Sequence, residues 1–247
     1  HGYEHEADAF GYRGEALKVR AGKAVEIKVK RLNLAERLYR ITGAGIYADS
    51  LLLDKAPDYA PPPVLAQVMG SDSVVNAIYH GKLYWFWGDT ERPEYPLGNF
   101  QVPGAISELP DKGGLDPAKG VTLSYFLDDQ GRAAETAHMP GSGPTWINGL
   151  ASVPDANGRE CLLTAYVKIR PPMTVYERGI AQFDDTRKQF QQVATVPLDA
   201  LLAPHGHPVS HQQGQTTYLY FGDPFPWVRT LATREAYGKA LAKLASS

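Results

Sequence analysis

The stretch that decides the fold is residues 72–89, DSVVNAIYHGKLYWFWGD. Two runs rich in β-branched and aromatic residues, 73–79 and 82–87, flank the pair His80-Gly81. Glycine adopts a positive φ without strain and histidine is among the residues that tolerate one, so this pair predicts a two-residue turn. The stretch therefore predicts an antiparallel β-hairpin that ends in Gly88-Asp89.

The same unit recurs twice further along the chain. The pairs Gly88-Asp89 and Gly222-Asp223 lie 134 positions apart, which is twice 67. About four strands in roughly 65 residues is the period of a propeller blade. The second copy consists of Trp146–Val153, an Asn157-Gly158 turn and Glu160–Val167. The third copy consists of Val209–His211, a Gln-Gln-Gly turn and Thr216–Phe221. Further strands are expected at Thr122–Phe126, Gly179–Phe183 and Phe190–Val196.

We therefore expect an all-β fold of propeller-like, repeated antiparallel blades. Three blades cannot close a ring, which needs at least four. Either the ring is incomplete, or a longer native chain or an oligomer supplies further blades, or the architecture is a sandwich. The expected divisions are an N-terminal, sandwich-like β segment at 1–54, a proline-rich linker at 55–69, three blades at 70–232 and a short amphipathic helix at 233–247. In the N-terminal segment, strands are expected over 15–31 with a break at Ala21-Gly22. The helix is expected to be capped by Thr233.

Composition excludes several classes of protein. The 247 residues carry a net charge of −2 with both signs mixed, which argues against a nucleic-acid partner. No apolar run approaches the roughly 20 residues that span a bilayer, so no membrane partner is expected. The single cysteine, Cys161, allows no intrachain disulfide and is expected to be a buried strand residue. The chain begins with His1, which is expected after signal-peptide removal or for an excised fragment, and we expect a secreted or periplasmic bacterial protein.

Two aspartates close the first hairpin. With the turn at His80-Gly81, the numbers of each facing pair sum to 161, so Asp72 lies opposite Asp89, with their Cα atoms roughly 5 Å apart. Two like charges at this distance are unfavourable unless a cation or a shared proton relieves them, and Arg92 is a natural partner. The repulsion would raise one pKa and make an acid available. The alternative is a solvated pair of turn aspartates that cap backbone N–H groups.

Aromatic residues adjoin this pair. Alternation places Trp85 and Trp87 on one face of the strand and Tyr84 and Phe86 on the other, and one face must pack in the core. Trp87, beside Asp89, could stack on a sugar ring; packing in the core is the alternative.

The segment Gly70–Thr90, with its WFWGDT sequence, resembles the opening blade of five-bladed β-propeller glycosidases, among them the arabinanase- and xylosidase-like enzymes and the agar-oligosaccharide hydrolases. The stretches RLYRITG at 37–43 and YPLG at 95–98 look like those of uncharacterised propeller proteins from planctomycete-type bacteria. The resemblance covers nearly the whole chain. It implies acids around the central axis, with Asp72 at the first position, Asn148 where a second acid is expected, and His207 where a general acid could sit.

The expected function is carbohydrate-active and glycoside-hydrolase-like, at the propeller rim and without a cofactor. Asp72, Asp89 and His207 are the catalytic candidates, and Trp87, Arg92, Trp146 and Asn148 are the substrate-binding candidates. The asparagine at 148 leaves a non-catalytic carbohydrate-binding or interaction module as the first alternative.

The second alternative is a copper-dependent oxidative polysaccharide enzyme. The start His1-Gly2-Tyr3 is similar to the histidine brace of lytic polysaccharide monooxygenases, which implies copper held by the α-amine and ring of His1 and by a second histidine. The spacing of His205, His207 and His211 fits no standard zinc motif, so no other metal is expected.

Overall fold

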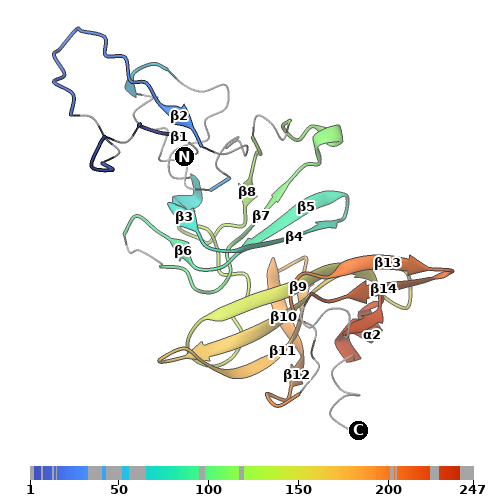
Figure 1. Ribbon diagram of the computed structural model, residues 1–247. Helices are drawn as coiled ribbons and strands as arrows, with labels where there is room; N and C mark the ends of the chain where they lie inside the picture. The colour runs from blue at the N-terminus through green and yellow to red at the C-terminus, as the bar shows by residue number, and fades with distance from the viewer. Residues whose placement is uncertain are drawn as a thin grey trace. The chain divides into compact units, whose positions relative to one another are not determined.

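The computed structural model describes residues 3–6, 8–12, 14, 16–32, 41–42, 52–55, 65–94, 98–116, 120–200, 203, 205–222 and 228–239. The chain divides into two compact units, residues 1–39 and 40–247. The regular secondary structure of the described part is almost all antiparallel β-sheet, with little helix, as expected (Figure 1). No helix in the described ranges is long and apolar enough to span a bilayer.

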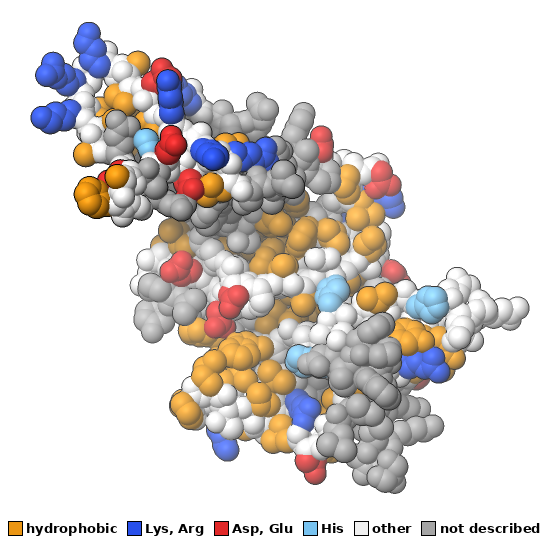
Figure 2. Space-filling model, viewed as in Figure 1, with side chains coloured by type: hydrophobic (Ala, Val, Ile, Leu, Met, Phe, Trp, Pro, Cys, Tyr) orange, Lys and Arg blue, Asp and Glu red, His pale blue; other side chains and the backbone are white. Residues whose placement is uncertain are grey.

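The N-terminal unit holds a two-stranded ladder in which β1 (Tyr3–Glu4) pairs antiparallel with β2 (Lys30–Arg31). The expected turn at Ala21-Gly22 is present, closed by a hydrogen bond from Lys23 N to Arg20 O of 3.1 Å. The prediction of strands was wrong for residues 16–29, which have no ladder. Their apolar side chains stay exposed, so no burial drives strand pairing there. Lysines and arginines gather over this unit in Figure 2.

The first meander consists of strands β4 (Val74–Tyr79), β5 (Lys82–Trp87), β7 (Gly104–Ser107) and β8 (Ser124–Tyr125), in that spatial order. It confirms the predicted hairpin: Tyr79 faces Lys82, and His80 and Gly81 have φ of 50° and 71°. A short ladder of β3 (Gly70–Ser71) with β6 (Thr90–Glu91) continues the hairpin. The 3-10 turn η2 (Leu65–Gln67) precedes β3 in sequence, and the 3-10 turn η3 (Pro110–Lys112) lies between β7 and β8.

The second meander consists of the long strands β9 (Thr145–Pro154), β10 (Glu160–Arg170), β11 (Thr174–Asp184) and β12 (Gln189–Val196). Its first hairpin lies where it was predicted, but only Gly158 of the Asn157-Gly158 pair has a positive φ, at 78°. The backbone N of Asp155 donates to Arg159 O at 2.8 Å, so the loop is a three-residue turn that closes with glycine.

The third meander consists of β13 (Val209–Gln213), β14 (Thr216–Tyr220) and β15 (Arg229–Leu231). Its turn is Gly214-Gln215 instead of Gln-Gln-Gly, because β13 stays paired through Gln213. Helix α2 (Arg234–Lys239) follows, as predicted, and the Thr233 hydroxyl accepts a hydrogen bond from Ala236 N at 3.2 Å. Residues 240–247 of the expected helix lie outside the described residues.

The second meander is buried on both faces. Between it and the first meander lies an aromatic core that includes Phe86, Phe126, Phe183 and Phe190. Its other face packs against the third meander and α2 through side chains such as Ile180, Leu219, Phe221 and Tyr237. The described strands form five separate sheets, namely the three meanders and the two-stranded ladders β1–β2 and β3–β6. Among these strands no sheet closes into a ring (Figure 1).

Three of the turns have the same feature, in which an aspartate side chain accepts backbone N–H groups of the turn. Asp128, Asp155 and Asp184 each do so, and the first two turns place Gly131 and Gly158 in the left-handed region. The third turn closes with Lys188 at φ 55° instead. A side chain in this region costs about 1 kcal/mol that glycine avoids.

Lys188→Gly is therefore expected to stabilise the protein by about 0.5–1 kcal/mol, after allowing for the greater chain entropy of glycine. Urea unfolding measures the change, and Lys188→Ala is the control because it removes the charge but keeps the strain. A loss of stability in the glycine variant would contradict this view of the turn.

Candidate carboxylate cleft

The structure confirms that Asp72 and Asp89 face one another. The ladders on either side share one register, with Val74 opposite Trp87 and Ser71 opposite Thr90. Between them, the backbone N of Asp72 donates to Asp89 O at 2.8 Å. The two-residue turn at the far end of the hairpin therefore fixes the position of both carboxylates.

A cleft of about 290 Å³, here called the carboxylate cleft, opens beside this pair. The first and second meanders both contribute to it. The Trp146 indole on β9 donates a hydrogen bond of 3.2 Å to Asp89 Oδ1, which links the two meanders at the floor of the site. The lining residues with polar or aromatic side chains are Asp72, Ser73, Phe86, Trp87, Asp89, Trp146, Asn148 and His205.

The two carboxylates have different environments. Burial raises the pKa of Asp89, with a smaller raising contribution from the charge of Asp72, while the hydrogen bond from Trp146 acts in the opposite direction. Asp72 is exposed. The predicted direction is confirmed, but the leading cause is burial between the meanders and not the repulsion between the pair.

This raised pKa has a consequence for stability. The folded protein binds a proton at Asp89 more readily than the unfolded chain does, so stability falls as the pH rises from the unfolded pKa, near 3.9, through the higher folded value. Asp89→Asn removes the ionisation and keeps an oxygen for the Trp146 indole. We expect this variant to melt at a higher temperature than the wild type at pH 7, and at the same temperature once the pH is low enough to protonate Asp89 in both states. Equal or lower melting at pH 7 would contradict the assignment.

Trp87 reaches the cleft but belongs mainly to the core. Its side chain is 4% exposed, and its ring lies parallel to that of Trp85 at 6.3 Å and packs against Tyr125 at 5.5 Å. Trp146 is more exposed and is the aromatic residue with more surface to offer a ligand.

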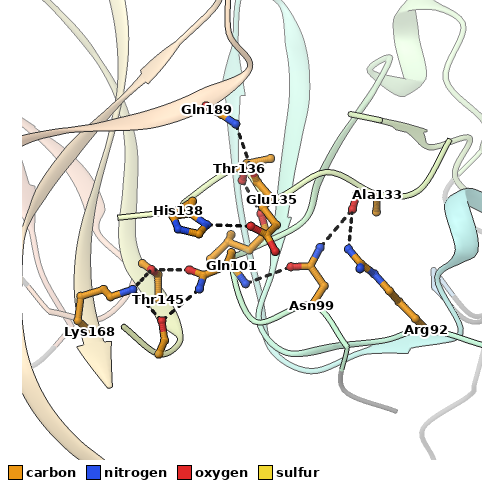
Figure 3. Close-up of polar contacts among 12 residues, drawn as sticks. Arg92, Asn99, Gln101, Ala133, Glu135, Thr136, His138, Thr145, Lys168 and Gln189 are labelled. Carbon is orange, nitrogen blue, oxygen red and sulfur yellow. Dashed lines mark hydrogen bonds and ion pairs between the residues drawn. The ribbon is translucent and has the colours of Figure 1, made fainter. Parts of the chain in front are cut away.

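Two predicted site residues lie elsewhere. Arg92 does not reach the carboxylates and instead donates to Ala133 O at 3.4 Å (Figure 3). It lines a separate hollow of about 730 Å³ with Asp128, Arg132 and other residues. His207 is exposed and does not line the cleft.

His205 lines the cleft in the place expected for His207. Gly206, between the two histidines, has φ 76°, so strand alternation does not hold across this stretch. The sequence His205-Gly206-His207 was the available signal, but it did not say which histidine faces the site.

Lys168 is a chemically notable residue that the sequence analysis missed. It is 0% exposed, and its Nζ donates to Gly143 O at 2.7 Å and to Thr145 Oγ1 at 3.2 Å. Thr145 in turn donates to Gln101 Oε1 at 2.8 Å, as Figure 3 shows. Burial lowers the pKa of Lys168. The ammonium group lines none of the described cavities, so it ties β10 to the segment before β9 and takes no part in the site.

The structure does not test the copper alternative, which depends on His1. His1 lies outside the described residues. Among the residues that are described, no group of three or more His, Cys, Asp or Glu side chains could hold a metal ion.

Comparison with known proteins adds no family: no family model matches the chain, and no curated protein matches its sequence.

Proposed function

We propose that this is a carbohydrate-active, glycoside-hydrolase-like protein that binds an oligosaccharide or polysaccharide in the carboxylate cleft. The observation that carries the proposal is the pair Asp72 and Asp89, which face one another in a cleft with an aromatic wall. Paired carboxylates in unlike environments are the groups that glycoside hydrolysis uses as acid and as base or nucleophile.

The different environments of Asp72 and Asp89 indicate which carboxylate acts as the acid and which as the ionised partner. Asp89, with its raised pKa, holds a proton to donate to the leaving-group oxygen, and the indole of Trp146 orients it. Asp72 is exposed and acts as the ionised partner, either on a water molecule or on the sugar. Trp146 offers a ring face to a pyranose, and Asn148 offers an amide to its hydroxyls.

The proposal includes a propeller arrangement of the three meanders. Consecutive meanders stack face to face through continuous cores, as blades do, and the cleft takes residues from the first strands of two of them. Further blades would come from a longer native chain or an oligomer. Roles for Trp87, Arg92 and His207 and a secreted or periplasmic location stay predictions.

The test is a panel of oligosaccharides of different linkage, incubated with the protein and followed by product analysis. Release of reducing ends from at least one member supports the hydrolase. Binding without any product would instead support the non-catalytic module, since Trp146 and Asn148 suffice to hold a sugar. If the protein neither binds nor cleaves any member of the panel, the proposal is contradicted.

A further inference from the structure

A second cavity of about 370 Å³, here called the adjoining cavity, continues the carboxylate cleft. The two share Asn148, Val167 and His205 as lining residues. A ligand that fills the cleft can therefore extend into the adjoining cavity without leaving the face of the second meander.

One row of side chains joins the two spaces. Trp146 on β9 lies opposite Val167 on β10, and Val167 lies opposite Arg178 on β11. Cross-strand partners share a face of the sheet, and neighbouring strands are about 4.8 Å apart. Arg178 therefore lies two strand spacings, or about 10 Å, from Trp146, on the side away from Asp89. The rest of the adjoining cavity is mainly apolar, with side chains that include Ala165, Val175, Val196, Leu198 and Ala203.

Arg178 is a cation without a carboxylate partner in the part of the chain that the structure describes. Its guanidinium donates to Leu198 O. Its Nε is buried and has no hydrogen-bond partner. A buried donor without a partner is costly, and most such groups in native proteins are satisfied.

Asn148 has an unsatisfied acceptor where Arg178 has an unsatisfied donor. Its Oδ1 is buried and accepts no hydrogen bond, although the residue lines both spaces. Both residues line the adjoining cavity, so a ligand there would lie beside two side chains that each have an unsatisfied polar atom. The site offers a bidentate cation at one end and an amide at the junction, which suits a ligand with an anionic group and a neighbouring hydroxyl.

We propose that the adjoining cavity is a subsite for an acidic sugar residue of the substrate, whose carboxylate pairs with Arg178 and whose hydroxyl donates to Asn148. This inference rests on the proposed function and adds the substrate class to it. The carboxylate pair repels an anionic group from the far end of the cleft, and Arg178 attracts it to this end. The substrate chain is thereby oriented, with its acidic residue beyond Trp146 and its scissile bond at Asp72 and Asp89.

The experiment uses matched pairs of ligands with one skeleton. Oligogalacturonates, alginate oligosaccharides and glucuronoxylan oligosaccharides are titrated into the protein, each as the free acid and as the methyl ester, by calorimetry. For the matching pair, the acid is expected to bind about 10- to 100-fold more tightly than the ester, the size of a hydrogen bond to a charged group. The preference is expected to weaken with added salt.

Arg178→Gln is expected to bring the affinity for the acid down to that for the ester, and Arg178→Lys to keep part of the preference. Arg170→Gln is the matched control, since Arg170 is an exposed arginine on the same sheet whose guanidinium lies over Tyr176. It is expected to leave both affinities unchanged. Melting temperatures identify any variant that fails to fold.

Three results would overturn this inference. Equal affinity for acids and esters contradicts it while leaving the proposed function intact, as does an acid preference that survives in a folded Arg178→Gln variant. Binding of no oligosaccharide, acidic or neutral, contradicts both.

Discussion

Asp89→Asn and Asp72→Asn are each expected to lower the turnover of a cleaved oligosaccharide by about 10²- to 10⁴-fold, the usual contribution of a positioned acid or base. Asparagine has the shape of aspartate and keeps a hydrogen-bonding oxygen, so the Trp146 contact and the affinity for the sugar should change little. Steady-state kinetics together with direct binding measurements separate the two quantities. The loss should fall on kcat and not on the dissociation constant.

Asp111→Asn is the matched control, because Asp111 is an exposed aspartate on η3 and lines none of the described cavities. The rate of wild-type turnover should also fall as the pH rises through the raised pKa of Asp89, since the proton donor is then lost. A rate that survives both cleft substitutions would mean that the acid and base lie elsewhere. Retained binding with no wild-type turnover would instead favour a binding module.

Phe86→Ala is expected to destabilise the protein by about 3–5 kcal/mol. The Phe86 side chain is 0% exposed, and its ring centre lies 4.9 Å from that of Phe190 and 5.6 Å from that of Phe183. Phe86 belongs to the first meander and its two partners to the second, so the cavity left by the substitution weakens the packing of one sheet against the other.

Urea unfolding followed by tryptophan fluorescence measures this effect. The shared core predicts that the two meanders unfold in one transition, in the wild type and in the variant. Phe10→Ala is the control, since Phe10 is 96% exposed, and should change stability by less than about 0.5 kcal/mol. A loss below about 1 kcal/mol for Phe86→Ala would contradict the packing described here.

The sequence was most informative where local chemistry decides the structure. A two-residue turn at His80-Gly81 permits one register, and that register placed Asp72 opposite Asp89 before any packing was known. The cap at Thr233 similarly located the start of α2. Both inferences depend on residues that are neighbours in a ladder or in one helical turn.

The parts that could not be predicted depend on contacts between distant segments. Burial of Asp89 and its bond to Trp146 arise from the packing of two meanders, which no local pattern encodes. Arg92 follows the last ladder pair of β6, where the register no longer constrains its direction, and it lies beside Ala133 instead of the carboxylates. The apolar alternation of residues 16–29 looked like a buried hairpin, but alternation predicts a strand only if a partner covers its apolar face.

A crystal structure of the Asp89→Asn variant with an oligosaccharide that the wild-type protein binds or cleaves would show directly whether sugar binds in the carboxylate cleft. We expect sugar in the carboxylate cleft, with one ring against Trp146 and a glycosidic oxygen within hydrogen-bond distance of the side chain at position 89. Sugar bound only in the hollow beside Arg92 or on another surface, with the carboxylate cleft empty, would contradict this expectation.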